Sequence, residues 1–140
     1  MKVAQTKQCT SCLRDLPLEN FHRDTRSHGG IRAACAECRV ANNRLARYGV
    51  TREQFDIMSA QQDGVCAICR EPETALANNG ASTKELAVDH NHRTGRTRSL
   101  LCSRCNQGLG KFRDDAKLLR AAADYLESHI TDRSVGEPRF

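Results

Sequence analysis

Apolar residues in this 140-residue chain fall into short periodic stretches that are separated by polar segments. A polar stretch with helical periodicity covers 39–48, and Gly49 stands where a left-handed residue would end that helix. Residues 51–54 have the spacing of a capping box, and Phe55 and Met58 lie on the apolar side of the helix that would follow. The pattern therefore predicts two successive helices with a break at Gly49.

The second half of the chain predicts a hairpin and two further helices. Residues 86–88 are a short apolar strand, 93–96 a turn, and 97–101 the returning strand. A helix is predicted from Asn106 to Phe112, and Asp114 can cap a longer helix after it. We therefore expect a strand–turn–strand–helix unit followed by a C-terminal helix.

The expected C-terminal helix carries an apolar stripe. Its members recur at helical spacing: Leu118, Leu119, Ala122, Tyr125, Leu126 and Ile130. Such a stripe usually packs against the rest of its own chain. Because other apolar surface is scarce, it could instead pack against a second copy, which leaves a homodimer open.

The composition limits the size of any hydrophobic core. Only 39% of the residues are hydrophobic, and the aromatic residues are four Phe and two Tyr, with no Trp. A chain of this length cannot bury large cores in two places, so another interaction must hold a second module together. No apolar run reaches the roughly 20 residues of a membrane span, and no hydrophobic segment at the start resembles a secretory signal. We therefore expect a cytoplasmic protein with no membrane partner.

The eight cysteines form four Cys-x-x-Cys pairs, which predict two Cys₄ zinc sites. The sets are Cys9, Cys12, Cys35 and Cys38, then Cys66, Cys69, Cys102 and Cys105. Disulfides and a redox pair are the alternatives, but four copies in a reducing compartment favour zinc. Sequential pairing is the simpler arrangement, and an interleaved one stays open. Four sulfur ligands leave no position for a substrate, so both ions would be structural.

The positive charge is concentrated in the first third of the chain. Lys and Arg exceed Asp and Glu by 22 − 17 = 5, and residues 1–50 contain nine bases and four acids, which accounts for the whole surplus. Two zinc sites with four thiolates each would remove most of it. The clustering of Arg39, Arg44 and Arg47 on the predicted helix is thus better evidence for DNA binding than net charge, although a solvated helix face explains the three equally well.

The candidate catalytic residues lie on the predicted hairpin and at the start of the helix that follows it. Asp89 and Asn106 offer a carboxylate and an amide oxygen, which are ligands that Mg²⁺ or Mn²⁺ prefers. His90 can accept a proton from an attacking water, as phosphodiester hydrolysis requires. The alternative is that His90 and His92 form another zinc site or lie on the surface.

Taken together, these motifs resemble the phage recombination endonuclease VII family, which belongs to the HNH or His-Me finger (ββα-metal) nucleases. The resemblance covers about 48–127 and rests on Tyr48-Gly-Val-Thr51, Cys66-Ala-Ile-Cys69, Val88-Asp-His-Asn-His92, Arg93-Thr-Gly95, Arg98-Ser-Leu-Leu-Cys102 and Cys105-Asn-Gln-Gly-Leu-Gly110. It implies His90 as general base, Asp89 and Asn106 as ligands of the catalytic metal, and His92 as an auxiliary active-site residue. Asn91 would tether the loop.

The resemblance also implies a fold class and a domain division. We expect a small α+β fold stabilised by zinc, with a ββα-metal nuclease domain over 49–140 that includes the C-terminal helix. Residues 1–48, with the first cysteine set and the basic helix, lie outside the minimal nuclease core and would form a separate zinc module. Similar extensions accompany HNH proteins from phages and restriction systems.

The expected function is a metal-dependent DNA endonuclease that leaves 5′-phosphate and 3′-hydroxyl ends. Its substrate would be duplex or branched DNA. The phosphate contacts are expected from Arg93, Arg96, Arg98 and Arg104, whose alternative is solvated turn charges. The rival function is a non-catalytic zinc-dependent DNA-binding or interaction protein. This alternative explains all eight cysteines equally well, but it leaves Asp89, His90 and Asn106 unexplained.

Overall fold

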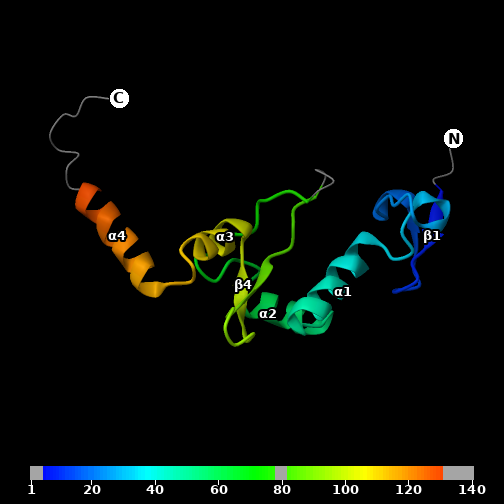
Figure 1. Ribbon diagram of the computed structural model, residues 1–140. Helices are drawn as coiled ribbons and strands as arrows, with labels where there is room; N and C mark the ends of the chain where they lie inside the picture. The colour runs from blue at the N-terminus through cyan, green and yellow to red at the C-terminus, as the bar shows by residue number, and fades with distance from the viewer. Residues whose placement is uncertain (1–4, 78–81, 131–140) are drawn as a thin grey trace, which may run out of the picture. The chain divides into compact units, whose positions relative to one another are not determined.

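The computed structural model describes residues 5–77 and 82–130 (Figure 1). Within these residues the strands are β1 (Thr6–Gln8), β2 (Asp15–Pro17), β3 (Ala87–His90) and β4 (Thr97–Leu101). The α-helices are α1 (Ala36–Tyr48), α2 (Arg52–Gln61), α3 (Ser103–Lys111) and α4 (Ala116–Ile130). The strands pair into two sheets, β1 with β2 and β3 with β4. The small α+β fold expected from the sequence is therefore confirmed.

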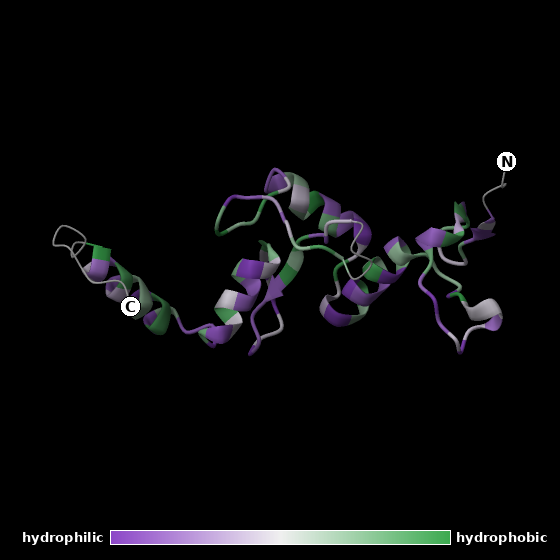
Figure 2. Ribbon diagram, turned by 90° about the horizontal axis from the view of Figure 1, so that it is seen from above, coloured by the Kyte–Doolittle hydropathy of each residue, from purple (hydrophilic) through white to green (hydrophobic). Residues whose placement is uncertain are grey.

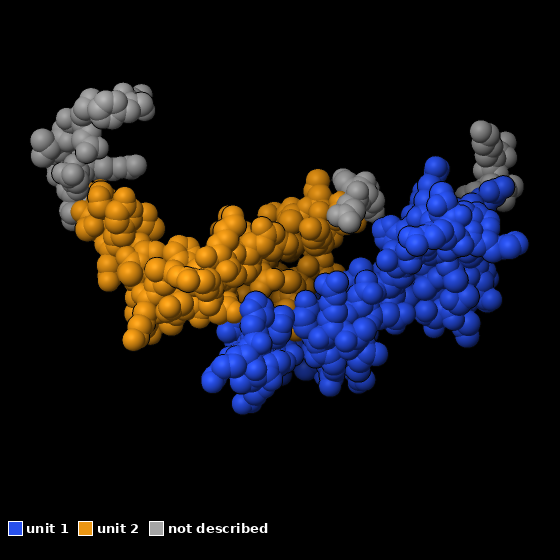
Figure 3. Space-filling view, in the orientation of Figure 1, with its two compact units in different colours: residues 1–64, 90–99 blue, residues 65–89, 100–140 orange. Residues whose placement is uncertain are grey.

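The chain forms two compact units (Figure 3). The first consists of residues 1–64 together with 90–99, and the second of 65–89 together with 100–140. The segment 90–99, which runs from the last residue of β3 into β4, thus groups with the N-terminal part of the chain. The domain division at Gly49 stays a prediction. No helix in the described ranges is long and apolar enough to cross a membrane.

The start of the first unit is held by a small core around the cysteines. Strands β1 and β2 pair antiparallel with Lys7 opposite Leu16. Cys9, Phe21 and Cys35 are 0%, 5% and 1% exposed and form the core cluster. This core contains a single large ring, which agrees with the scarcity of apolar residues in the sequence and makes the cysteines its main structural element.

Helix α1 begins three residues before the predicted start. The Cys35 side chain is its N-cap and accepts the Cys38 N–H, so the cysteine pair forms the first turn rather than preceding the helix. Gly49 ends α1 with φ of 66°, as expected. Thr51 and Gln54 form both hydrogen bonds of the predicted capping box at the start of α2, which is confirmed.

In the hairpin of the second half, β3 begins one residue and ends two residues later than the predicted strand 86–88, so Asp89 and His90 belong to the strand. Strand β4 covers the predicted 97–101, and its Leu100 and Leu101 are almost fully buried. Helix α3 begins at Ser103 instead of Asn106, because Cys102 caps it as Cys35 caps α1. The order β3, β4, α3 is the ββα succession expected for the nuclease core.

Helix α4 differs from its prediction at its start and in its packing. The cap expected at Asp114 is wrong by one residue: Asp115 Oδ1 accepts the N–H of Lys117 and Leu118 at 2.8 and 3.2 Å, while Asp114 has a left-handed φ of 53°. Figure 2 shows apolar residues recurring along α4. None of its residues is buried, and Leu126 and Ile130 are 62% and 67% exposed. The stripe therefore does not pack into a core within the described chain.

Candidate functional site

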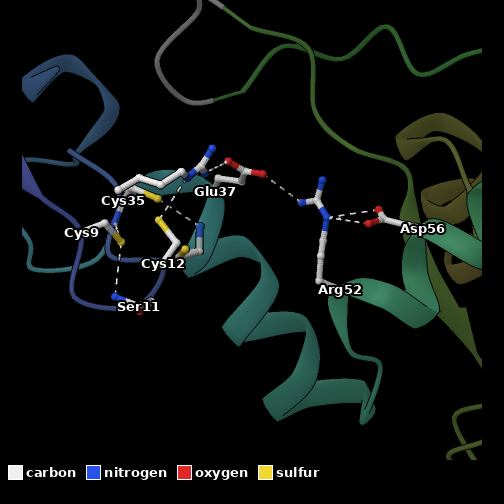
Figure 4. Close-up of polar contacts among 9 residues, drawn as sticks. Cys9, Ser11, Cys12, Cys35, Glu37, Arg52 and Asp56 are labelled. Carbon is white, nitrogen blue, oxygen red and sulfur yellow. Dashed lines mark hydrogen bonds and ion pairs between the residues drawn. The ribbon is translucent and has the colours of Figure 1, made fainter. Parts of the chain in front are cut away.

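The four cysteines of the first set meet at the start of α1. The sulfur atoms of Cys9, Cys12, Cys35 and Cys38 all lie within 4.8 Å of one another. Figure 4 labels the first three of these residues. Cys9 Sγ accepts the N–H groups of Ser11 and Cys35 at 3.4 and 3.3 Å. Such N–H···S bonds orient a thiolate toward a shared ion.

The second set repeats this backbone arrangement. Cys66, Cys69, Cys102 and Cys105 also place their sulfurs within 4.8 Å of one another. Cys66 accepts the N–H of Ile68 at 3.5 Å, and Cys102 accepts that of Cys105 at 3.4 Å while capping α3. Sequential pairing of the cysteine sets is thus what the structure shows. Each cluster joins one Cys-x-x-Cys turn, which we call the knuckle (9–14 in the first cluster and 66–71 in the second), to the first turn of one helix, α1 or α3.

The two clusters have the same pattern of backbone hydrogen bonds. In the first, Cys9 N–H donates to Arg14 O and Thr10 N–H to Ala33 O, at 2.9 and 3.2 Å. In the second, Cys66 N–H donates to Glu71 O and Ala67 N–H to Leu100 O, at 2.9 and 3.1 Å. The acceptors occupy equivalent positions relative to the cysteines. Apart from the Cys-x-x-Cys pairs, the sequence gives no signal of this correspondence.

The thiols within each cluster differ strongly in acidity. N–H groups of Cys12 and Cys35 lower the pKa of Cys9 to about 6. Burial raises the pKa of Cys66, but N–H groups of Cys102 and Cys69 outweigh it and bring the pKa to about 6. Burial and neighbouring thiols raise the pKa of Cys38 and of Cys105 to about 12. Without a cation, four thiolates cannot coexist in either cluster.

Both clusters fit a zinc ion. Zn–S bonds of about 2.3 Å in a tetrahedron place neighbouring sulfurs about 3.8 Å apart. Cys69 Sγ and Cys102 Sγ are 3.8 Å apart. A divalent ion would also stabilise the thiolate form of the two least acidic thiols. The donor set and its spacing therefore support two structural zinc sites, with no open position on either.

An arginine and a glutamate connect the two halves of each cluster, with their positions exchanged. In the first cluster Arg14 lies on the knuckle and bonds Glu37 on α1 at 2.7 Å. In the second Glu71 lies on the knuckle and Arg104 on α3, at 3.2 Å. Each arginine also donates a hydrogen bond to a thiol of the knuckle, Arg14 to Cys12 and Arg104 to Cys69. The thiol and the glutamate together raise the pKa of each guanidinium group. These arginines offset the negative charge that four thiolates bring to each ion.

The hairpin loop presents two histidine rings. The His90 and His92 ring centroids are 4.7 Å apart with their planes at 64°, and the Tyr48 ring lies 5.0 Å from His90. Asn91 Oδ1 accepts the N–H groups of Arg93 and Thr94 at 2.9 and 3.0 Å. The expected tethering role of Asn91 is confirmed, and it fixes the loop directly after His90.

The two candidate metal ligands lie in the second unit. Asp89 in β3 is only 7% exposed. A carboxylate is rarely so buried unless it is paired with another group. Asn106 lies in the first turns of α3, where its N–H donates to Cys102 O at 3.0 Å. A carboxylate and an amide oxygen are suitable donors for Mg²⁺ or Mn²⁺, so the residues present fit such an ion.

The predicted DNA-contacting arginines fall into different environments. Arg93, Arg96, Arg98, Arg104 and Arg47 are exposed, and Arg39 is half-buried. Arg44 is only 5% exposed, and its guanidinium carbon lies 3.6 Å from the Phe55 ring centroid. That position makes Arg44 a packing residue between α1 and α2.

Two residues with clear contacts were not assigned a role from the sequence. Tyr48 belongs to the motif Tyr48-Gly-Val-Thr51, but nothing in the sequence relates it to His90. Glu73 Oε2 accepts the N–H and hydroxyl of Ser103 at 2.6 and 2.7 Å, which ties the second knuckle to α3. Thirty residues separate these two partners, so no local pattern could have indicated the contact.

Three comparisons relate the chain to known proteins. A sequence model described as recombination endonuclease VII matches residues 41–128. The gene 59 proteins of Mycobacterium phages D29 and L5 are 35% and 33% identical over 138 residues, with 94% of this chain covered and 79% and 80% of theirs. The crystal structure of the ββα-Me type II restriction endonuclease Hpy99I is similar at 28% identity and a TM-score of 0.41. That match covers 89% of this chain and 66%, just under two thirds, of the other.

Proposed function

This chain belongs to the recombination endonuclease VII family, and on that premise we propose that it is a metal-dependent DNA endonuclease of the HNH type. One observation carries the proposal. The β3–β4–α3 succession lies inside the matched residues 41–128, with Asp89 and His90 at the end of β3 and Asn106 on α3. A purely structural or binding module would not need these three side chains.

His90 is the proposed general base. An imidazole ordinarily exchanges its proton near neutral pH, which suits it to take a proton from water at the start of hydrolysis. The water oxygen then attacks phosphorus, and the bond to the 3′ oxygen breaks. That oxygen takes up a proton from solvent, which leaves a 5′-phosphate and a 3′-hydroxyl. His92, whose ring contacts that of His90, is the proposed auxiliary residue.

Asp89 and Asn106 are the proposed ligands of a catalytic Mg²⁺ or Mn²⁺. When bound, such an ion neutralises charge that develops on the phosphate and on the leaving oxygen. The two side chains provide few of the ligands that these ions require, and water and phosphate oxygens would provide the rest. We therefore expect this ion to be released far more easily than the zinc ions.

The proposed DNA contacts come from arginines near the hairpin and on α1. Arg93, Arg96 and Arg98 are exposed around the loop that follows His90, and Arg47 is exposed on α1. Guanidinium groups bind phosphate oxygens without reading the base sequence. Arg44 is left out because it is buried against Phe55. The substrate would be duplex or branched DNA in the cytoplasm of a bacterial or phage-infected cell.

The test is cleavage by the purified full chain. Supercoiled plasmid and a synthetic four-way junction are incubated with and without Mg²⁺ or Mn²⁺, and nicked, linear and resolved products are separated on gels. Cleavage of either substrate only when the cation is present is the expected result. Binding of both substrates without cleavage at any cation concentration would refute the nuclease and favour the non-catalytic zinc protein.

A further inference from the structure

Helix α1 runs without a break from the first cysteine cluster to Tyr48. Its N-cap Cys35 and its first-turn Cys38 are two of the four sulfur residues of the cluster, and Tyr48 is its last residue. Gly49 then ends it, and the Gly49 N–H donates to Leu45 O at 2.9 Å. One rigid element therefore has a metal cluster at one end and an aromatic ring at the other.

That aromatic ring contacts the proposed base. The Tyr48 and His90 ring centroids are 5.0 Å apart with planes inclined at 47°, and His92 contacts His90 at 4.7 Å. The segment 90–99 belongs to the same compact unit as residues 1–64. The His90 ring thus has one aromatic neighbour from the hairpin loop that follows it and one from the end of α1.

Two further contacts fix α1 along its length. Arg44 stacks on Phe55 of α2, with its guanidinium carbon 3.6 Å from the ring centroid. Near the cluster, Glu37 pairs with Arg14 of the knuckle at 2.7 Å and with Arg52 of α2 at 3.7 Å (Figure 4). The orientation of α1 is therefore set mainly by the first cluster and by α2.

The length of α1 decides how the cluster can influence His90. Thirteen residues rise roughly 20 Å. The charge of the cluster is largely screened over that distance, since the Debye length in physiological salt is about 8 Å. A tilt of about 5° at the cluster would nevertheless displace the far end by roughly 2 Å, and a misplacement of about 1 Å can reduce a rate by ~10². Any influence is mechanical.

Building on the proposed function of His90, we propose that Tyr48 is the positioning residue for the His90 ring and that the first cysteine cluster holds Tyr48 in place through α1. The N-terminal zinc module is then a support of the nuclease centre. As a separate DNA-binding attachment it would influence affinity alone. The two roles predict different kinetic consequences when the module is perturbed.

The first experiment replaces the aromatic ring. Tyr48→Leu should lower kcat for plasmid nicking at least roughly tenfold with little change in KM. Tyr48→Phe keeps the ring and should have a kcat close to that of the wild type. Tyr125→Leu is the matched control, because Tyr125 also contacts a histidine ring, His129, at 4.4 Å but lies on exposed α4. Two bound zinc ions and an unchanged circular dichroism spectrum establish that each variant is folded.

A spectroscopic measurement separates positioning from general destabilisation. The ring-proton resonances of His90 should move in Tyr48→Leu, and those of His129 should not. Wild-type kcat in Tyr48→Leu, or a lowered kcat that Tyr48→Phe does not restore, would overturn the positioning role. His90→Ala is measured in parallel: if it retains the wild-type rate, the proposed function has failed, whereas an inactive His90→Ala beside a fully active Tyr48→Leu refutes only the inference.

The second experiment perturbs the far end of the helix. Cys38→Ser should release one zinc per chain, move the His90 resonances and lower kcat at least roughly tenfold. Cys105→Ser, which perturbs the second cluster, provides a comparison for the loss of one zinc. Loss of one zinc from Cys38→Ser with wild-type kcat, unchanged His90 resonances and weakened DNA binding would overturn the inference, because the module would then act through DNA affinity alone.

Discussion

Glu73 offers a quantitative test of how the second cysteine cluster is held together. Its Oε1 accepts the N–H groups of Thr74 and Ala75 at 2.8 and 2.9 Å, and its Oε2 accepts the N–H and hydroxyl of Ser103 at 2.6 and 2.7 Å. All four groups are donors. In Glu73→Gln, the side-chain NH₂ must therefore face at least one backbone N–H at either position, because only the Ser103 hydroxyl can turn to accept.

The magnitude follows from the kind of bond that is lost. A hydrogen bond to a charged group contributes about 1.5–3 kcal/mol, and the half-buried position of Glu73 favours the lower part of that range. We expect Glu73→Gln to lower the free energy of unfolding by about 2 kcal/mol at pH 7. Glu71→Gln is the matched control, because its 3.2 Å ion pair with Arg104 is exposed and a solvent-screened pair of this kind contributes little to stability.

The pH dependence gives a second, independent readout. Burial alone would raise the pKa of Glu73, but the hydrogen bonds from Ala75 and Ser103 outweigh it and lower the pKa below its ordinary value of 4.5. A carboxyl whose folded pKa is depressed stabilises the fold above its unfolded pKa and loses that contribution as the pH falls through the folded value. The difference between wild type and Glu73→Gln should therefore be full at pH 6–7 and diminish only in acid.

Urea unfolding at constant free zinc, followed by circular dichroism from pH 4 to 7, measures both quantities. Constant zinc is necessary because acid also protonates the cysteines and releases the ions. A Glu73→Gln variant no less stable than Glu71→Gln at pH 7 would refute the reasoning. So would a difference that grows as the pH is lowered.

Three further predictions concern metals and arginines. The purified chain should keep two zinc ions through gel filtration, and mild EDTA should stop cleavage without unfolding; elemental analysis and circular dichroism check this, and finding one zinc would contradict it. Asp89→Ala should be inactive but regain part of its activity at high Mg²⁺, which cleavage assays over a range of Mg²⁺ measure; no gain would count against Asp89 as a ligand. Arg47→Ala should reduce the salt dependence of DNA binding by about one unit of log–log slope, and Arg44→Ala should leave the slope unchanged while it destabilises the fold by about 1–2 kcal/mol. Binding isotherms at several salt concentrations and urea unfolding decide between these roles, and equal slopes for the two variants would be the contrary outcome.

Local signals in the sequence were sufficient for most of the secondary structure. The capping box at Thr51, the helix end at Gly49 and the strand 97–101 each depend on neighbouring residues, and the structure confirms all three. The starts of α1 and α3 were predicted three residues late. In both cases a cysteine caps the helix, and a spacing rule that treats cysteine only as a metal ligand misses this second role.

The contacts that could not be predicted join residues far apart in the sequence. Arg44 was expected on a basic surface, but α2 covers it, and only the packing of α1 on Phe55 reveals this. The Tyr48–His90 contact depends on the segment 90–99 grouping with the N-terminal residues. Hydrophobic periodicity identifies which face of a helix is apolar, but it contains no information about which distant segment will cover that face.

The proposed nuclease centre at His90 is tested most directly by one substitution measured in two ways. His90→Ala and the matched His129→Ala, on exposed α4, are compared for nicking of supercoiled plasmid in Mg²⁺ and for DNA binding without cleavage. Loss of a general base typically lowers a rate by ~10²–10⁴. The proposed function predicts that His90→Ala binds DNA as wild type does but nicks at least roughly a hundredfold more slowly, while His129→Ala nicks normally. Wild-type nicking by His90→Ala would contradict the assignment.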